Sequence, residues 1–248
     1  MGGPDEGGVE AQRRSHVDLS ASPLEKSGTL RLCGDHACVC GANLTVVTPS
    51  PSQLSHVWSS AAVGVDALPV EIETHLASGL PHYTLVGLPD GAVRESWERV
   101  RAALKMSGLP VPRCRTTVNL APADVRKEGA AFDLPIALGL VAALSDRLPR
   151  ARFDTSVILG ELALDGTVRP VRGVLPATLR ARRDGRTTVI VPRENAAEAA
   201  VVEGIDVYGV ASLAEAHAVL AGEHGSIAPL RRRDYLLLDA LVHHDVGA

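Results

Sequence analysis

The chain has 248 residues, of which 46% are hydrophobic but only 3% are aromatic. This length allows one sizeable core or two, and a core built from Val, Leu, Ile and Ala suits strands that alternate with helices. The formal net charge of -4 excludes a general attraction to nucleic acid, although a local basic face can still bind it.

The first 55 residues differ in composition from the rest. They are rich in Gly, Ser, Pro and charge, so we expect residues 1–55 to form a flexible, mostly disordered leader. Cys33, His36, Cys38 and Cys40 cluster there; zinc binding is the alternative use for them, but their spacing matches no usual zinc knuckle, and we assign no metal site. The low cysteine content and the lack of an apolar run of about 20 residues predict a cytoplasmic protein with no membrane partner.

Short strands are predicted from residue 57 onward, at 63–65 ("VGV"), 69–77 ("PVEIETHLA") and 83–88 ("YTLVGL"). The alternation in the second run places four residues on one face: Val70, Ile72, Thr74 and Leu76. An amphipathic helix follows, because four apolar residues fall on one helical stripe before a Gly and a Pro end it: Val93, Trp97, Val100 and Leu104. Asp90, just before this helix, is expected to be a cap.

A charged turn, "RKEGAA" at 126–131, lies between a predicted strand at 114–122 and a predicted buried helix. The helix is entered at Asp133, with Pro135 tolerated in its first turn. We expect Lys127, in the turn, to be a solvated loop charge. Further along, Asp165-Gly166 between two β-type runs predicts a hairpin.

Helices and strands alternate in the last third of the domain. The predicted order is a helix at 174–185, a strand at 187–192, a helix at 194–202, a strand at 205–210 and a helix at 212–222. Residues 223–248 show no pairing signal and are expected to form a short tail or truncated linker. The domain itself is therefore predicted to span residues 56–222.

Several stretches, in order, resemble one family. They are "GLPHYTLVGLPDGAVRESWERVRAALKMSGLPVP", "TVNLAPADVRKEGAAFDLPIALGLVAAL", "LGELALDGTVRPVRGVLPATLRARRDG" and "VIVPRENAAEAA". They resemble the amino-terminal domain of magnesium-chelatase-like AAA+ proteins of the ComM/YifB type, over about residues 57–222. The resemblance implies an α+β fold of the ribosomal-protein-like and Lon-protease-like kind, a two-layer domain with a mixed sheet and packed helices.

The resemblance to Lon also implies where a catalytic dyad would lie. Lon-type proteases use a Ser nucleophile whose proton is taken by a deprotonated Lys. By resemblance, Ala131 occupies the place of that Ser, and Leu175, in "RGVLP", occupies the place of the Lys. We therefore expect no catalytic residue. The chain also has no Gly-Lys dipeptide and so no phosphate loop, and ATP and Mg²⁺ are implied only for a AAA+ module that this chain lacks.

Two segments are basic although the chain as a whole is acidic. Residues 94–115 carry six basic residues against two acidic ones, and residues 169–186 carry six against one. If the two segments share a face, they could follow a phosphate backbone; the alternative is an ordinary soluble surface. The nucleic-acid-binding candidates are Arg94, Arg99, Arg101, Lys105, Arg113, Arg115, Arg180, Arg182, Arg183 and Arg186.

The resemblance thus implies a non-catalytic interaction or DNA-contacting module of a DNA-processing motor, with a role in recombination and natural transformation. Its expected partners are DNA and either a separate AAA+ ATPase chain or further copies of itself. Two alternatives remain open: a degenerate Lon-like serine protease, and a gene remnant without activity that arose by truncation, gene splitting or a frameshift.

Overall fold

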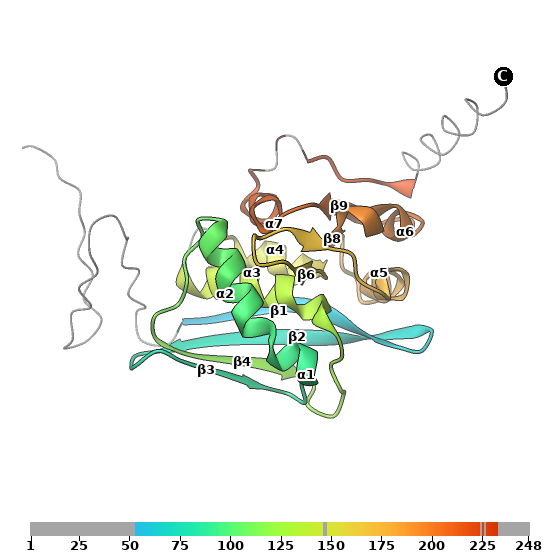
Figure 1. Cartoon of the computed structure of the whole chain (residues 1–248). Coiled ribbons are helices and arrows are strands. Elements are labelled where there is room, and N and C mark those ends of the chain that lie inside the picture. Colours follow the sequence, from blue (N-terminus) through green and yellow to red (C-terminus); the bar gives the residue numbers. More distant parts are fainter. Residues whose placement is uncertain (1–52, 146–147, 224, 226, 233–248) are drawn as a thin grey trace, which may run out of the picture. The chain divides into compact units, whose positions relative to one another are not determined.

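A computed structural model describes residues 53–145, 148–223, 225 and 227–232. The predicted leader up to residue 52, its Cys33–Cys40 cluster and the tail from residue 233 lie outside the described residues. The centre of the domain is a seven-stranded sheet in the order β3-β4-β2-β1-β5-β8-β9 (Figure 1). Its strands are β1 (Gln53–Val63), β2 (Asp66–Ala77), β3 (His82–Val86), β4 (Arg115–Ala121), β5 (Ser156–Ile158), β8 (Thr188–Pro192) and β9 (Asp206–Val210).

The sheet is mixed. Antiparallel pairing joins β1 to β2 and β2 to β4, whereas β3 to β4, β1 to β5, β5 to β8 and β8 to β9 are parallel. A separate two-stranded hairpin, β6 (Glu161–Leu162) with β7 (Val168–Arg169), forms around the predicted Asp165-Gly166 turn. The predicted mixture of strands and helices is confirmed as a mixed seven-stranded sheet, and the closer likeness to ribosomal-protein and Lon folds stays a prediction.

Helices follow or precede most strands. They are α1 (Gly91–Arg94), α2 (Ser96–Met106), α3 (Asp133–Leu144), α4 (Arg150–Thr155), α5 (Val174–Arg183), α6 (Ala196–Ala200) and α7 (Leu213–Ala221), with two 3₁₀ turns, η1 (Ala130–Phe132) and η2 (Arg193–Asn195). The prediction that α3 begins at Asp133 is confirmed. Asp90 is the predicted cap, because its carboxylate accepts a hydrogen bond from the Val93 amide at 2.8 Å.

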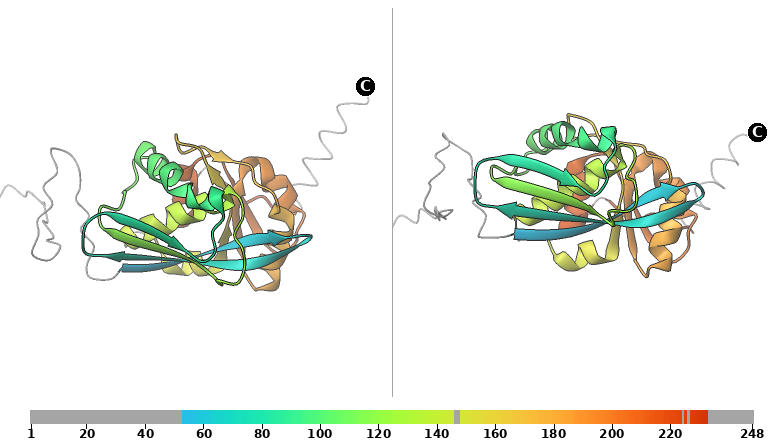
Figure 2. Two further views of the ribbon diagram at one scale, coloured as in Figure 1. Left: turned by 60° about the horizontal axis from the view of Figure 1, so that its bottom comes forward. Right: turned by 90° about the horizontal axis from the view of Figure 1, so that it is seen from below.

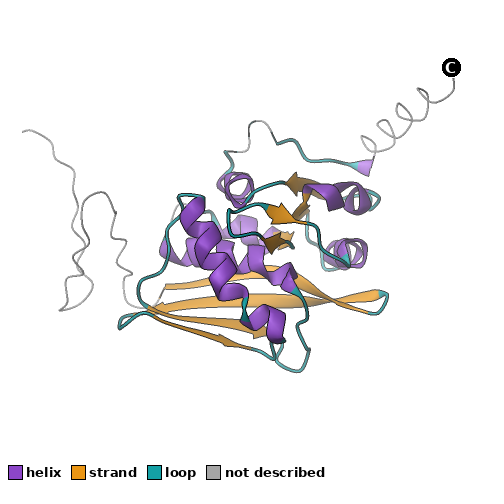
Figure 3. Ribbon diagram, viewed as in Figure 1, coloured by secondary structure: helices purple, strands orange, loops and turns teal. Residues whose placement is uncertain are grey.

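Two apolar cores lie on opposite faces of the sheet. Alternate residues of one strand divide between them: Ile158 belongs to the core that holds α2, α3 and α7, whereas Val157 belongs to the core that holds α5 and α6. Figure 3 shows α7 on one side of β8 and β9 and α5 and α6 on the other. The expected two layers therefore become three around β5, β8 and β9.

At the centre of β1, β2 and β4, the face of the sheet that points away from α3 carries polar, half-buried side chains. Core-facing residues of β2 are fully buried, as the alternation predicted for Val70, Ile72, Thr74 and Leu76. The residues between them point away from α3, and Figure 2 (right) shows β1 to β4 in front of the helices from this side. We call this surface the open face.

The strand β1 is the main error of the sequence prediction. Residues 63–65 are not a strand but the end of β1 and the turn into β2, and β1 begins at Gln53, three residues before the predicted start of the domain. Serines hid its alternation, because Ser55 and Ser59 face the core. Each buried hydroxyl is satisfied by donating to a carbonyl, that of Gly139 at 2.7 Å and that of Ile158 at 2.8 Å.

The described part of the predicted tail does have a partner. Leu230 exchanges two backbone hydrogen bonds with Val207 of β9, so residues beyond 223 contribute to the edge of the sheet. The sequence carried no signal for this contact because a single bridge needs no periodic pattern. Among the described residues, no helix has the length and apolar composition that crossing a lipid bilayer requires.

Candidate functional site

The turn that carries Ala131 is held by backbone and side-chain hydrogen bonds from the start of α1. Asp90 donates its amide to the carbonyl of Lys127 at 3.0 Å, and its carboxylate accepts from the Gly129 amide at 3.0 Å. Gly129 has a φ of 79°, a conformation that favours glycine over any other residue. Ala131 itself is half-buried on η1, and its carbonyl accepts from the Gly160 amide at 2.9 Å.

Lys127 corrects the expectation of a solvated loop charge. Its side chain is fully buried, and its ammonium group donates to the carbonyl of Pro122. Burial lowers the pKa of the Lys127 amine, and the nearby charge of Asp124 opposes that shift. This hydrogen bond joins the turn at Lys127 to Pro122, just after the end of β4.

Leu175 lies in the first turn of α5, where the resemblance implied a Lys. Its half-buried side chain packs against the core of α5 and α6, and its amide donates to the carboxylate of Glu198 at 2.9 Å. Leu175 therefore contributes apolar packing and a helix-start amide. Neither of these is a proton acceptor for a nucleophile.

Asp133 and Arg99 form a buried ion pair beside this turn. The guanidinium of Arg99 donates to both carboxylate oxygens, at 2.7 and 3.1 Å, and to the carbonyl of Ala92 at 2.9 Å. The Leu162 amide donates to the same carboxylate at 3.3 Å. Burial raises the pKa of the Asp133 carboxyl against the opposing effect of Arg99, and the hydrogen bond to Asp133 raises the pKa of Arg99. The pair joins α2, α3 and β6.

The helices that carry most of the two basic segments, α2 and α5, lie on opposite faces of the sheet. The helix α2 packs on the core with α3 and α7, whereas α5 packs on the core with α6. Arg113 and Arg115 are exposed at the start of β4, and the alternation of β4 directs Arg115 to the open face. The fold therefore separates the basic residues of α2 from those of α5, whereas Arg115 faces the side of the sheet on which α5 packs.

The basic candidates also differ in whether they are already paired. Arg99 is bound to Asp133, Arg101 to Glu98 at 2.9 Å and Arg180 to Asp184 at 2.9 Å. Arg186 lies over the ring of Trp58, 4.2 Å from the centroid, and donates to the carbonyl of Asp154. Exposed and without an ion-pair partner in the described part of the chain are Arg94, Lys105, Arg115, Arg182 and Arg183.

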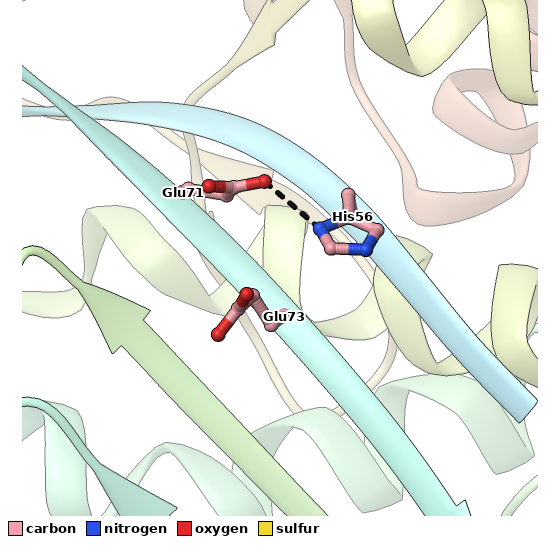
Figure 4. A group of neighbouring side chains, drawn as sticks. All are labelled: His56, Glu71 and Glu73. Atoms are coloured by element: carbon pink, nitrogen blue, oxygen red, sulfur yellow. Dashed lines mark hydrogen bonds and ion pairs between the residues drawn. The ribbon is translucent and has the colours of Figure 1, made fainter. Parts of the chain in front are cut away.

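A further group of polar side chains, on the open face, was missed by sequence reasoning. His56 of β1 and Glu71 and Glu73 of β2 place one potential metal-ligand atom each within 4.8 Å of one another (Figure 4). The Nδ1 of His56 lies 2.8 Å from Oε1 of Glu71. The signal that could have found them is the hairpin register, which pairs His56 with Glu73, but it required the turn after Val63 to be recognised.

Comparison with known proteins identifies the family. Residues 72–195 match the family described as subunit ChlI of Mg-chelatase. The chain is 45% identical over 170 residues to competence protein ComM of Haemophilus influenzae, covering 68% of this chain and 33% of that protein. The chain belongs to the magnesium-chelatase-like family of the ComM/YifB type. YifB of Escherichia coli is 41% identical over 176 residues, covering 71% of this chain and 34% of YifB.

A more distant similarity reaches Lon. The chain is 31% identical over 135 residues to the Lon protease of Roseiflexus castenholzii, covering 50% of this chain and 16% of that protein. This ComM/YifB-type chain spans about a third of the length of the curated family members it matches. What those whole proteins do is therefore not transferred to it directly.

The Arg99–Asp133 pair predicts a large difference between two neighbouring arginines. Arg99→Ala leaves the Asp133 carboxylate buried without its cation, so we expect it to lower the free energy of unfolding by about 3–5 kcal/mol. Arg101→Ala, which removes an exposed pair, should change it by about 1 kcal/mol or less. Urea unfolding followed by circular dichroism measures both; equal effects of the two variants would contradict the assigned role of Arg99.

The burial of Lys127 predicts selective chemical protection. An amine-reactive succinimidyl ester should modify exposed Lys105 in the native chain, whereas Lys127 should react at least about tenfold more slowly because its reaction requires local opening. Peptide mass spectrometry measures each site. In urea both lysines should react alike, and equal labelling in the native chain would show that Lys127 is solvated after all.

Proposed function

We propose that this chain is a non-catalytic module of the ComM/YifB type that binds DNA for a DNA-processing motor. The proposal that the module is non-catalytic rests on the side chains at the two positions that the resemblance aligns with the Lon dyad. The methyl group of Ala131 and the isobutyl group of Leu175 offer no nucleophile and no base. The one amine on the same turn, that of Lys127, is buried and bound to a carbonyl.

The buried or capping charged groups around the turn have structural contacts, which supports the same conclusion. Asp90 caps α1 and holds Gly129, and Asp133 neutralises Arg99. The protease alternative therefore has no residue to support it, and we do not propose it.

The DNA contact is proposed for the C-terminal end of α5. Arg182 and Arg183 are adjacent, exposed and without an acidic partner among the described residues. Arg186, three residues after Arg183, lies over the ring of Trp58. A guanidinium held on an aromatic ring keeps its charge available to a phosphate. The helix α2 is a weaker candidate, since Arg99 and Arg101 are paired within the fold.

The similarity to competence protein ComM of Haemophilus influenzae supports a role in recombination and natural transformation. In this proposal the ATP-dependent work belongs to a AAA+ module, either on a separate chain or in assemblies of several copies. The module described by residues 53–232 supplies binding surface. It needs neither ATP nor Mg²⁺ for that.

Salt-dependent DNA binding tests the proposal. Fluorescence anisotropy with labelled single-stranded and branched DNA, over a series of salt concentrations, gives the slope of log K against log salt. For single strands each phosphate contact contributes about 0.7 to that slope. The double variant Arg182→Ala/Arg183→Ala should therefore lower its magnitude by about 1.4.

The matched control removes two charges from the opposite face. Arg94→Ala/Lys105→Ala changes the net charge by the same amount but should leave the slope unchanged, because α1 and α2 pack on the other side of the sheet from α5. Absence of binding at low salt would overturn the proposal. Equal losses for the two double variants would show that the attraction is unspecific and does not reside in α5.

A further inference from the structure

We infer that His56, Glu71 and Glu73 form a binding site for a first-row divalent transition-metal ion on the open face of the sheet. The three side chains come from β1 and β2, which pair along their whole length. Glu71 and Glu73 are two residues apart on one strand and so point to the same face. His56 lies directly opposite Glu73 in the register, and its ring reaches Glu71 diagonally (Figure 4).

The distances fit three ligands of one ion. The three potential ligand atoms lie within 4.8 Å of one another, and Nδ1 of His56 lies 2.8 Å from Oε1 of Glu71. Zn²⁺ takes nitrogen and oxygen ligands at about 2.0–2.2 Å, which places ligand atoms roughly 3–4 Å from one another. An ion bound by all three groups would therefore draw the most distant ligand atoms together by about 1 Å.

The charge of the group favours a cation. Two carboxylates share one patch, and among the described residues neither Glu71 nor Glu73 pairs with a Lys or Arg. Within the described part of the chain, the side chains that contact the two carboxylates are His56 and Asn119, and neither is a Lys or Arg. A divalent ion would neutralise the charge of the two carboxylates, whereas without one they repel each other.

One ligand is also held from behind. The side-chain amide of Asn119, from β4, donates to Oε2 of Glu73 at 2.6 Å, so that a second neighbouring strand orients this carboxylate. Hydrogen bonds of this kind fix the direction of a metal ligand. The site is therefore built on three adjacent strands, which move less than loops do.

The donor set indicates the class of metal. One imidazole and two carboxylates suit Zn²⁺, Mn²⁺, Co²⁺ or Fe²⁺ better than Mg²⁺, which prefers oxygen ligands and keeps most of its waters. His56 is 40% exposed and Glu71 30% exposed, so the remaining coordination positions face solvent. The site would hold the ion with water or a ligand from outside in the open positions.

Isothermal titration with Zn²⁺ tests the inference on the full chain. Because Cys33, His36, Cys38 and Cys40 could bind zinc independently, the parent protein for the test carries Cys33→Ser, Cys38→Ser and Cys40→Ser. We expect one equivalent to bind. His56→Gln and Glu73→Gln in this parent should each weaken binding by on the order of 10–100-fold or more. Millimolar Mg²⁺ should not displace the ion.

The matched control is His75→Gln. His75 lies on β2, on the same face as Glu71 and Glu73, but it is not one of the three proposed ligands. It should leave the affinity unchanged. Thermal unfolding in EDTA shows whether each variant is folded, so that a loss of binding is not a loss of structure. The inference would be overturned if the parent did not bind Zn²⁺, or if His56→Gln and Glu73→Gln bound it as tightly as the parent does.

A cobalt spectrum of the unmodified chain distinguishes metal bound at the site on the sheet from metal bound by the cysteines of the leader. Co²⁺ bound by one imidazole and two carboxylates gives visible bands without thiolate-to-metal charge-transfer absorption, whereas binding by the leader cysteines adds that absorption. We expect visible bands that disappear with His56→Gln. Bands that persist in His56→Gln and carry thiolate absorption would assign the metal to the leader and contradict the site on the sheet.

Discussion

The antiparallel register of β1 and β2 determines which of their side chains enter the core and which lie on the open face. Because side chains alternate along a strand, pairing His56 with Glu73 directs Val57 and Ile72 into the core and the polar residues between them to the open face. A slip of one residue would exchange the two faces, burying carboxylates and exposing the core. The apolar packing against α3 thus also fixes the His56, Glu71 and Glu73 group on the far side.

The turn between β4 and α3 depends on a second set of interactions, and these give several of its charged residues a structural role. Asp90 holds the turn from α1, Lys127 fastens it to Pro122, and the Arg99–Asp133 pair secures the start of α3. Charges in a turn that is similar to a protease motif would normally suggest an active site. Here Asp90, Lys127 and the Arg99–Asp133 pair have partners within the fold, and the two positions that the resemblance aligns with the Lon dyad carry aliphatic side chains.

Periodic elements could be predicted from the sequence, and contacts between distant elements could not. The faces of β2 and α2, the start of α3 and the Asp165-Gly166 hairpin followed from alternation and turn residues. The strand β1 was missed because Ser55 and Ser59 interrupt its apolar alternation, and the metal-binding group was missed with it. The burial of Lys127 also left no trace in the sequence, since a lysine beside other charges has the pattern of a solvated loop.

The central claim is that the Lon-like dyad positions have lost their chemistry while the surrounding turn keeps a structural role. Labelling with a fluorophosphonate probe, which reacts with activated serines, tests this most directly when a serine hydrolase is labelled in parallel as a control. We predict no labelling of the native chain above the level of the heat-denatured chain. Stoichiometric labelling of a serine in the native chain, lost on denaturation, would contradict it.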